Sequence, residues 1–180
     1  MKKLLVVVDY QNDFVSGALG FPGAEKLEAG IVHQVEATLA EGGQVLFTRD
    51  THEADYLQTR EGIHLPIPHC VEGSTGHQLY GKLHTYEEHR VPGTMLLDKP
   101  TFGCVDIGKK AAGLCGGAPD VIELCGLVTD ICVIANAILL HSYFPKAQMR
   151  VLAALCGSGN AAGAQGALDI MRGMGMEIVP

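Results

Sequence analysis

The sequence predicts an α/β protein, a three-layer, doubly wound sandwich with a mostly parallel six-stranded sheet, in a single domain that spans residues 1–180. Short β-branched runs alternate with longer segments of helical spacing, and this alternation implies a parallel sheet that is covered on both faces. The strand-like runs are almost continuously apolar, as expected of strands buried on both sides. A length of 180 residues with 47% hydrophobic residues suits one sizeable domain.

The predicted strands are short runs rich in Val, Ile and Leu. In chain order they are LLVVV, QVLFTRD, TMLLDK, VIELCGL and MRVLAAL, and a sixth short strand is expected at the end of the closing segment. They cover residues 4–8, 44–50, 94–99, 121–127 and 149–155, with the last strand inside 166–179.

Segments with helical spacing lie between these strands. Residues 24–43 carry apolar side chains at helical spacing and stop at a Gly-Gly pair, a natural helix terminator. A second helix is expected to follow residues 121–127 and to carry Cys132, and a third occupies the first part of 166–179. Residues 51–93 are expected to form a long irregular insertion.

Composition and charge exclude several classes of protein. A formal net charge of −7 without a Lys/Arg cluster argues against nucleic acid or an anionic membrane as the main partner. The amino terminus has only five apolar residues before Asp9, too few for a signal-peptide core. No stretch approaches the roughly 20 apolar residues that cross a bilayer. We therefore expect a soluble, cytoplasmic protein.

The cysteines do not form a recognisable metal or disulfide framework. None of them belongs to a C-x-x-C pair, which excludes the usual zinc-ribbon and thioredoxin spacings. In a cytosolic chain most should be reduced, buried thiols. The six cysteines are at positions 70, 104, 115, 125, 132 and 156.

Polar residues end several of the predicted strands or lie just beyond them. They are Asp9, Asp50, Lys99 and Cys132. In open parallel sheets, ligands bind outside the carboxyl ends of the strands. Carboxylates, an ammonium and a thiol would thus gather at one edge of the sheet, which indicates a reactive site there.

Cys132 lies where an apolar strand turns into a helical pattern. Thr129 is a good N-cap, which would place Cys132 at the third helical position. There the free backbone N–H groups and the helix dipole favour a thiolate, lower the thiol pKa and could form an oxyanion hole. A buried cysteine that faces the sheet is the alternative, and we expect Cys125, inside the strand, to be of that kind.

Asp9 and Lys99 would complete a catalytic set. Asp9 could act as general base for the thiol and then as general acid for an amine leaving group, although a turn or helix cap is the alternative. A lone lysine at the end of a strand is usually solvated. Beside a carboxylate and a thiol, however, the charge of Lys99 would hold both in their ionised forms.

A second group of polar residues suits a metal ion. Asp50 and His52 lie two residues apart in a loop that leaves a strand, and His69 follows a proline-stiffened turn. One carboxylate and two imidazoles, with positions left open for water or substrate, suit a divalent transition metal such as Zn²⁺. The D-x-H pattern alone is weak in a chain with eight histidines.

Five motifs, in this order and at these spacings, resemble the isochorismatase-like cysteine hydrolases, and among them the nicotinamidases and their relatives. The motifs are VVVDYQNDF, TRDTHEADY, LPIPHCVEGSTG, DKPTFGC and IELCGLVTDICV. The similarity extends over essentially the whole chain, through the closing GALDIMRGMGMEIV.

The resemblance implies roles for individual residues of these motifs. It implies Cys132 as nucleophile, Asp9 and Lys99 as its catalytic partners, and Asp50, His52 and His69 as ligands of a divalent metal, with Zn²⁺ favoured. It also implies a cis peptide between Leu127 and Val128, an oxyanion hole formed by the backbone N–H groups of Val128 and Cys132, and a homo-oligomer, since members are often dimers or tetramers.

The sequence also departs from the nicotinamidase pattern. Nicotinamidases usually read D-W-H and have a Trp a few residues before the H-C pair, but Thr51 and Pro66 stand at these positions. Phe14 remains as a substrate-binding residue that could pack on a ring. The departures weaken nicotinamide as substrate without affecting the hydrolytic residues.

The function expected from these observations is a metal-containing cysteine amidohydrolase that acts on a small-molecule amide. Nicotinamide, converted to nicotinate and ammonia, is the leading substrate. The alternatives are an amidase for an N-carbamoyl or ureide substrate and a non-catalytic scaffold of the same fold. A nucleotide-binding Rossmann domain is excluded, because no G-x-G-x-x-G follows the first strand.

Overall fold

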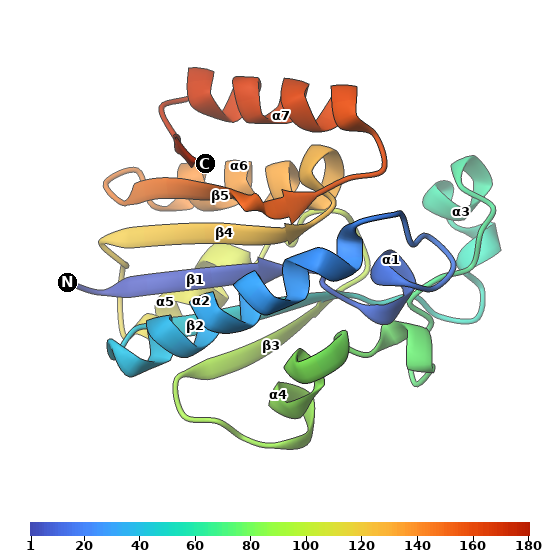
Figure 1. The fold of residues 1–180 in the computed structure, drawn as a ribbon, viewed down its shortest axis with the longest axis horizontal. Helices are drawn as coiled ribbons and strands as arrows, with labels where there is room; N and C mark the ends of the chain where they lie inside the picture. The colour runs from blue at the N-terminus through green and yellow to red at the C-terminus, as the bar shows by residue number, and fades with distance from the viewer.

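A six-stranded sheet forms the centre of the computed structural model, which describes all 180 residues (Figure 1). Its strand order is β3-β2-β1-β4-β5-β6, and every neighbouring pair is parallel, so the predicted mostly parallel sheet is confirmed. The strands are β1 (Lys3–Val8), β2 (Gln44–Asp50), β3 (Thr94–Lys99), β4 (Val121–Leu127), β5 (Gln148–Gly157) and β6 (Glu177–Val179).

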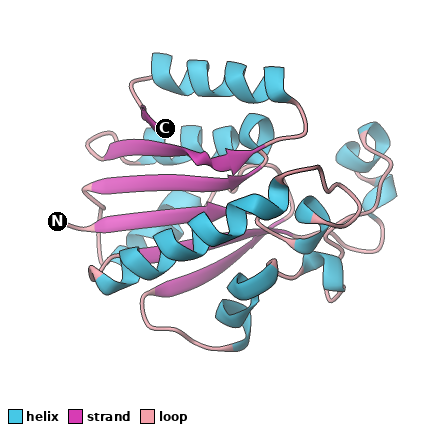
Figure 2. Cartoon of the chain, in the orientation of Figure 1, coloured by secondary structure: helices cyan, strands magenta, loops and turns pink.

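Helices cover both faces of the sheet and complete the three layers (Figure 2). Alternate residues of β1 belong to two separate cores, because side chains of a strand point alternately to its two faces. One core joins the sheet to α5, α6 and α7, and the other joins it to α2 and to the insertion after β2. The helices are α1 (Asn12–Val15), α2 (Glu28–Ala40), α3 (Arg60–His64), α4 (Thr85–Glu88), α5 (Ile107–Cys115), α6 (Ile134–Tyr143) and α7 (Ala161–Gly173).

Some element boundaries differ from the sequence predictions. The predicted helix at 24–43 begins as a 3₁₀ turn over Ala24–Leu27 and ends at Ala40. Helix α5 was not predicted, because two glycines interrupt its short pattern and lower its helix propensity. Gly108 is nevertheless needed there, since a Cβ at this position would lie 2.2 Å from the ring of Tyr143.

The insertion after β2 contains only short helical turns, in agreement with the irregular segment expected at 51–93. Its first part, with α3, lies together with α1 at the carboxyl ends of the strands, at the right of Figure 1, and its last part, with α4, lies near β3 at the bottom. No helix of the structure combines the length and the apolarity that crossing a membrane requires.

The strand order explains why the site lies at the centre of this edge. The chain runs outward from β1 to β2 and β3 and then returns to place β4 on the other side of β1. A doubly wound sheet binds ligands at such a switch point, between β1 and β4. Asp9 follows the first of these strands, and the segment with Cys132 follows the second.

Candidate active site

Asp9, Lys99 and Cys132 lie side by side at the switch point. The ammonium Nζ of Lys99 is 2.6 Å from Oδ2 of Asp9 and 3.7 Å from Sγ of Cys132. All three residues are buried, with exposed fractions of 0%, 0% and 4%. The structure thus brings together the acid, the base and the thiol that the sequence analysis placed at one edge of the sheet.

Thr48, on the neighbouring strand β2, fixes the carboxylate of Asp9. The Thr48 hydroxyl donates to Oδ1 of Asp9 at 2.6 Å, and the Asp9 backbone N–H points back to the same hydroxyl at 3.2 Å. Asp9 has a φ of +45°, a left-handed conformation that non-glycine residues adopt rarely and that is typical of functional sites. Oδ2 pairs with Lys99 but accepts no hydrogen bond of normal geometry, so it remains available to a proton.

Lys99 is the only buried lysine of the chain. Its ammonium also lies 3.3 Å from Oδ1 of Asp50 and donates to the carbonyl of Thr101 at 3.1 Å. Burial alone would lower the pKa of Lys99, but the negative charges of Asp9 and Asp50 outweigh it and raise the pKa. Lys99 is therefore a fixed positive charge between two carboxylates and the sulfur.

The nucleophile turn differs from the predicted N-capped α-helix. Residues Thr129–Val133 form a single π-helical turn that leads into α6, and the backbone N–H of Val133 donates to the carbonyl of Val128 at 3.1 Å. The capping position is Val128, and Thr129 is a buried residue of the turn itself. The assignment of Thr129 as N-cap was therefore wrong. A π turn inserts one residue into the helical ladder, a feature common at functional sites.

The thiol also differs from the predicted low-pKa thiolate. Burial raises the pKa of Cys132 well above its usual value, the charge of Asp9 raises it further, and Lys99 opposes both. The pKa of Asp9 is raised as well, because its burial outweighs the charge of Lys99. Burial therefore favours the protonated thiol over the thiolate at this site. Any helix dipole effect from one short turn is smaller than the cost of burying the charge.

Asn136, in the first turn of α6, fixes the backbone around the nucleophile. Its side-chain N–H groups donate to the carbonyl of Cys132 at 2.8 Å and to that of Phe102 at 3.1 Å. Its oxygen accepts from the backbone N–H of Cys104 at 3.0 Å. One buried amide thus ties the nucleophile turn to the loop that follows Lys99.

The three predicted metal ligands converge beside this group. Nε2 of His52 and Nε2 of His69 lie 3.0 Å and 3.3 Å from Oδ2 of Asp50. Glu61, on α3, joins them, with Oε1 3.5 Å from Nε2 of His52 and 3.7 Å from that of His69. One ligand atom from each of the four residues lies within 4.8 Å of every other.

The neighbouring residues set the charge of the donor atoms. Burial lowers the pKa of His52, but Asp50 and Glu61 outweigh it and raise the pKa to about 9, so a cation would take the place of a proton on this imidazole. Nδ1 of His69 lies 2.8 Å from the carbonyl of Ile67, which makes Nδ1 the protonated nitrogen and leaves Nε2 with its lone pair toward the cluster. Burial raises the pKa of Asp50, but its contacts with the imidazoles of His52 and His69 and the charge of Lys99 outweigh it, so the pKa is lowered. An ionised carboxylate and converging imidazoles fit a divalent transition metal.

Two aromatic rings orient the imidazoles. The buried ring of Tyr56 lies with its centroid 4.5 Å from that of His52 and 5.0 Å from that of His69. Phe14 contacts the ring of His69 edge-on, with centroids 5.4 Å apart. Phe14 is only 7% exposed. In this structure it therefore packs against a candidate ligand, and its predicted contact with substrate stays a prediction.

Comparison with known proteins identifies the family. Residues 3–180 match the family model of the isochorismatase domain. The chain belongs to the isochorismatase family. The predicted kinship with isochorismatase-like, nicotinamidase-related proteins is thus confirmed.

One family member and several solved structures are similar to this chain over most or all of its length. An uncharacterised isochorismatase family protein of Bacillus subtilis (strain 168), PncA, is 32% identical over 147 residues, which are 77% of this chain and 78% of that one. The crystal structure of nicotinamidase PncA from Bacillus subtilis covers 100% of both chains, with a TM-score of 0.86 and 29% identity. Pyrazinamidase of Pyrococcus horikoshii, solved with zinc, shares the fold over 99% of both chains, with a TM-score of 0.83 and 23% identity.

The backbone before the nucleophile has the geometry that membership of the isochorismatase family implied. The peptide bond between Leu127 and Val128 is cis. Just before it, Gly126 has a φ of +113°, and a Cβ there would lie 2.1 Å from the carbonyl oxygen of Val8. Glycine is therefore required at this position, where β4 pairs with Val8 of β1.

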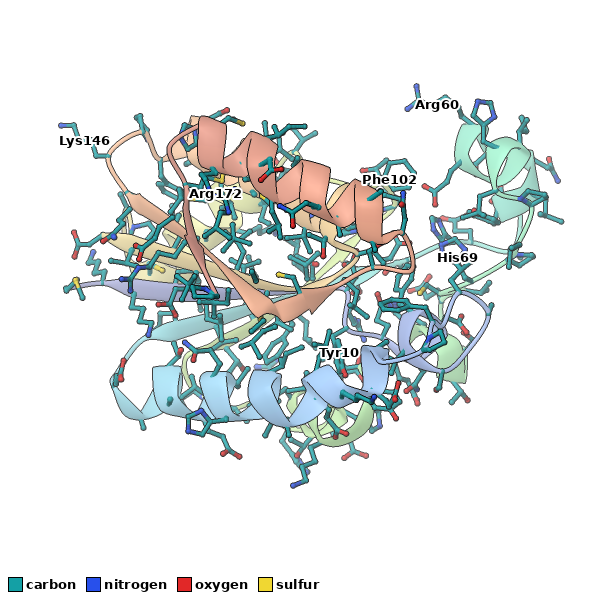
Figure 3. The ribbon with its side chains drawn as sticks, turned by 45° about the horizontal axis from the view of Figure 1, so that its top comes forward. Tyr10, Arg60, His69, Phe102, Lys146 and Arg172 are labelled. Atoms are coloured by element: carbon teal, nitrogen blue, oxygen red, sulfur yellow. The ribbon has the colours of Figure 1, made fainter.

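A cavity of about 480 Å³ opens between α3 and the loop after β3. Its walls include the apolar side chains of Leu65, Phe102 and Ile131, the last being the neighbour of the nucleophile. Figure 3 shows Arg60, which also lines the cavity, at the same end of the molecule as Phe102 and His69. A second, polar cavity of about 370 Å³ reaches His52 and Lys99. The first cavity reaches the nucleophile turn at Ile131, and Cys132 is not among its lining residues.

Sequence reasoning missed several residues of this site. They include Glu61 in the metal cluster, Tyr56 on the imidazoles, and Thr48 and Asn136 behind the catalytic side chains. Glu61 could have been noticed as an acidic residue between the two predicted histidine ligands. The others follow no spacing rule, because their partners are distant in the chain.

Proposed function

We propose that this chain is a metal-containing cysteine amidohydrolase that acts on a small carboxamide, with nicotinamide, converted to nicotinate and ammonia, as the leading substrate. One observation carries the proposal: a buried lysine joins a carboxylate and a thiol, with Nζ 2.6 Å from Asp9 and 3.7 Å from Cys132. The similarity to a nicotinamidase over the full length of both chains supports the choice of substrate.

The first half-reaction would transfer the acyl group to the enzyme. Sγ of Cys132 attacks the carboxamide carbon while Asp9 takes the thiol proton, so no free thiolate has to exist in the buried resting site. The backbone N–H groups of Val128 and Cys132 would stabilise the resulting oxyanion. The C–N bond then breaks, Asp9 returns the proton to the nitrogen, and ammonia leaves a thioester on Cys132.

The second half-reaction would release the acid. Asp9, again a carboxylate, removes a proton from a water molecule that attacks the thioester carbon. The C–S bond breaks, and the proton passes to the departing sulfur, which regenerates the thiol. Throughout, Lys99 keeps one positive charge between Asp9 and Cys132 and so favours each state in which one of them is negative.

Asp50, His52, Glu61 and His69 would hold a divalent metal. Two imidazole nitrogens and two carboxylate oxygens within 4.8 Å of one another fit Zn²⁺ in number and type. A bound metal ion supplies Lewis-acid character and a fixed positive charge that can orient a water molecule or a substrate nitrogen. Asp50 would link it to the catalytic group, because its second oxygen faces Lys99 at 3.3 Å.

Ammonia release tests the proposal. The purified protein is incubated with nicotinamide and, in parallel, with N-carbamoyl and ureide compounds. Cys132→Ala should abolish release, whereas Cys125→Ala, a change of the same kind in the adjoining strand, should leave it in place. A mass spectrum of the quenched reaction should show the acyl group on Cys132.

The outcomes separate the rival functions. Release of ammonia from the N-carbamoyl or ureide compounds alone would favour the related amidase activity over nicotinamide hydrolysis. Equal release by the wild type and Cys132→Ala would reject the cysteine mechanism. Absence of turnover with every amide would favour a non-catalytic scaffold of the same fold.

A further inference from the structure

Gln11 makes an unusual set of contacts with the strand end that carries Asp50. Its side chain is fully buried, with an exposed fraction of 0%. The amide Oε1 accepts from the backbone N–H of Asp50 at 2.7 Å, and Nε2 donates to the backbone carbonyl of the same residue at 2.9 Å. Nε2 also donates to the carbonyl of His77 at 2.7 Å. The side-chain amide thus pairs with Asp50 as a neighbouring strand would.

Asp13, two residues after Gln11, makes a single hydrogen bond at the other end of the metal cluster. Its Oδ2 accepts from the backbone N–H of Cys70, the residue after His69, at 2.7 Å. Cys70 has a φ of +45°, so its backbone is in a conformation that surrounding contacts must maintain. The carboxylate lies so close to Gly76 that a Cβ there would be 2.0 Å from Oδ2.

The catalytic scheme does not use either side chain. Both come from the short segment between Asp9 and Phe14, yet they reach two stretches that lie roughly 40 and 60 residues further along the chain. These stretches carry Asp50 and His69, which face each other at 3.3 Å. A short backbone bridge already joins the two stretches, because the N–H of His52 donates to the carbonyl of Cys70 at 3.0 Å and the N–H of Glu72 donates to the carbonyl of His52 at 2.9 Å. Gln11 and Asp13 add side-chain contacts on either side of this bridge.

We propose that Gln11 and Asp13 are positioning residues that hold the two chain segments of the metal cluster in register. Gln11 fixes the backbone of Asp50 and thereby directs one carboxylate oxygen to Lys99 and the other to the imidazoles. Asp13 fixes the backbone beside His69. The inference rests on the metal site of the proposed function, and it adds the groups that build this site in the absence of the ion.

The chain provides its own matched control. Asn12 lies between Gln11 and Asp13 and also makes a side-chain hydrogen bond to a distant backbone group, from Nδ2 to the carbonyl of Thr75 at 2.7 Å. This contact lies at the surface and involves neither ligand segment. Substitution of Asn12 therefore removes the same kind of bond from the same motif without touching the metal cluster.

The test measures metal affinity and ligand geometry rather than turnover. The full-length wild type, Gln11→Leu, Asp13→Leu, Asp13→Asn and Asn12→Ala are stripped of metal and titrated with Zn²⁺ against a chromophoric chelator. Loss of groups that orient metal ligands typically weakens affinity by about 10–100-fold, and we expect this for Gln11→Leu and Asp13→Leu. Asp13→Asn keeps an acceptor oxygen and should stay within about threefold of the wild type, as should Asn12→Ala.

The absorption spectrum of the Co²⁺-loaded proteins provides a second readout. It should change in Gln11→Leu and Asp13→Leu and match the wild type in the other two variants, because ligand geometry sets the d–d bands. Should Gln11→Leu fail to fold, the two Asp13 variants decide alone. Affinities and spectra of the leucine variants that equal those of the wild type would overturn the inference.

The test is independent of the hydrolytic proposal. A wild-type protein that binds neither Zn²⁺ nor Co²⁺ would overturn the inference and the metal part of the proposed function together. Hydrolysis through Cys132 would still be judged by ammonia release. Conversely, tight Zn²⁺ binding that depends on Gln11 and Asp13 would support the inference even if no amide were turned over.

Discussion

Replacement of Lys99 by methionine removes a buried positive charge while keeping most of the side-chain volume. The ammonium lies 2.6 Å from Asp9 and 3.3 Å from Asp50, and neither carboxylate has solvent to replace it. We expect Lys99→Met to abolish amide hydrolysis and, in addition, to lower the free energy of unfolding, because Asp9 would be left as an unpaired buried charge.

The size of the effect follows from these distances. At an effective dielectric constant of ~20, contacts of 2.6 Å and 3.3 Å correspond to attractions of about 6 and about 5 kcal/mol. Much of this offsets the cost of burying the ammonium, and loss of one partner of a buried pair typically costs about 3–5 kcal/mol. We expect a loss in this range at pH 7.

The pH dependence has a defined sign. Burial raises the pKa of Asp9 while Lys99 opposes it, so the pKa rises further when Lys99 is removed. The folded variant then binds a proton that the unfolded chain releases, which makes its stability fall as the pH rises from acid to neutral. The loss relative to the wild type should therefore be smaller at pH 5 than at pH 7.

Urea denaturation of the single variants and of the double variant Lys99→Met/Asp9→Asn measures this coupling. The double variant should be more stable than Lys99→Met, because no uncompensated charge remains at Asp9, yet it should stay inactive. A Lys99→Met protein as stable as the wild type at pH 7 would refute the reasoning. A double variant that is less stable than the sum of the two single-variant effects predicts would also refute it.

Three further perturbations test other parts of the structure. Gly126→Ala should lower the free energy of unfolding by about 2 kcal/mol or more, since φ is +113° and the Cβ would lie 2.1 Å from Val8; an unchanged urea midpoint would contradict this. Because burial raises the pKa of the Cys132 thiol, its alkylation by iodoacetamide should accelerate up to pH 9 and beyond, and a plateau near pH 7 would show a thiolate instead. Glu61→Gln should raise the Zn²⁺ dissociation constant at least about tenfold, and equal affinity by chelator competition would remove Glu61 from the cluster.

The sheet could be predicted from the sequence because its signals are local. Runs such as LLVVV are apolar without interruption, and the strand boundaries at 44–50, 94–99 and 121–127 agree with the structure. The placement of Asp9 beside Lys99 followed from a general rule, that the carboxyl ends of parallel strands meet at one edge. These predictions needed no knowledge of packing.

The parts that could not be predicted depend on burial or on contacts between distant segments. The thiol pKa of Cys132 was wrongly expected to be low, because the sequence shows the nearby helix but not the burial of the residue, which is 4% exposed. Glu61 and Tyr56 reach the metal cluster through short turns without periodicity. The role of Thr129 was wrong for a related reason, since nothing local distinguishes a π turn from an N-capped α-helix.

The strand order also has a consequence for biosynthesis. Every candidate catalytic and metal-binding side chain except Cys132 lies within the first 99 residues, whereas the sulfur arrives on the segment after β4, which must pair with β1. During synthesis, β1 therefore has one unpaired edge until β4 has been made. Until then, Asp9 and Lys99 also lack the thiol of Cys132 beside them. A break of the chain between β3 and β4 would yield two fragments, one with an unpaired edge at β1 and the other with an unpaired edge at β4. Pairing of β1 with β4 would then be the step that brings Cys132 next to Asp9 and Lys99.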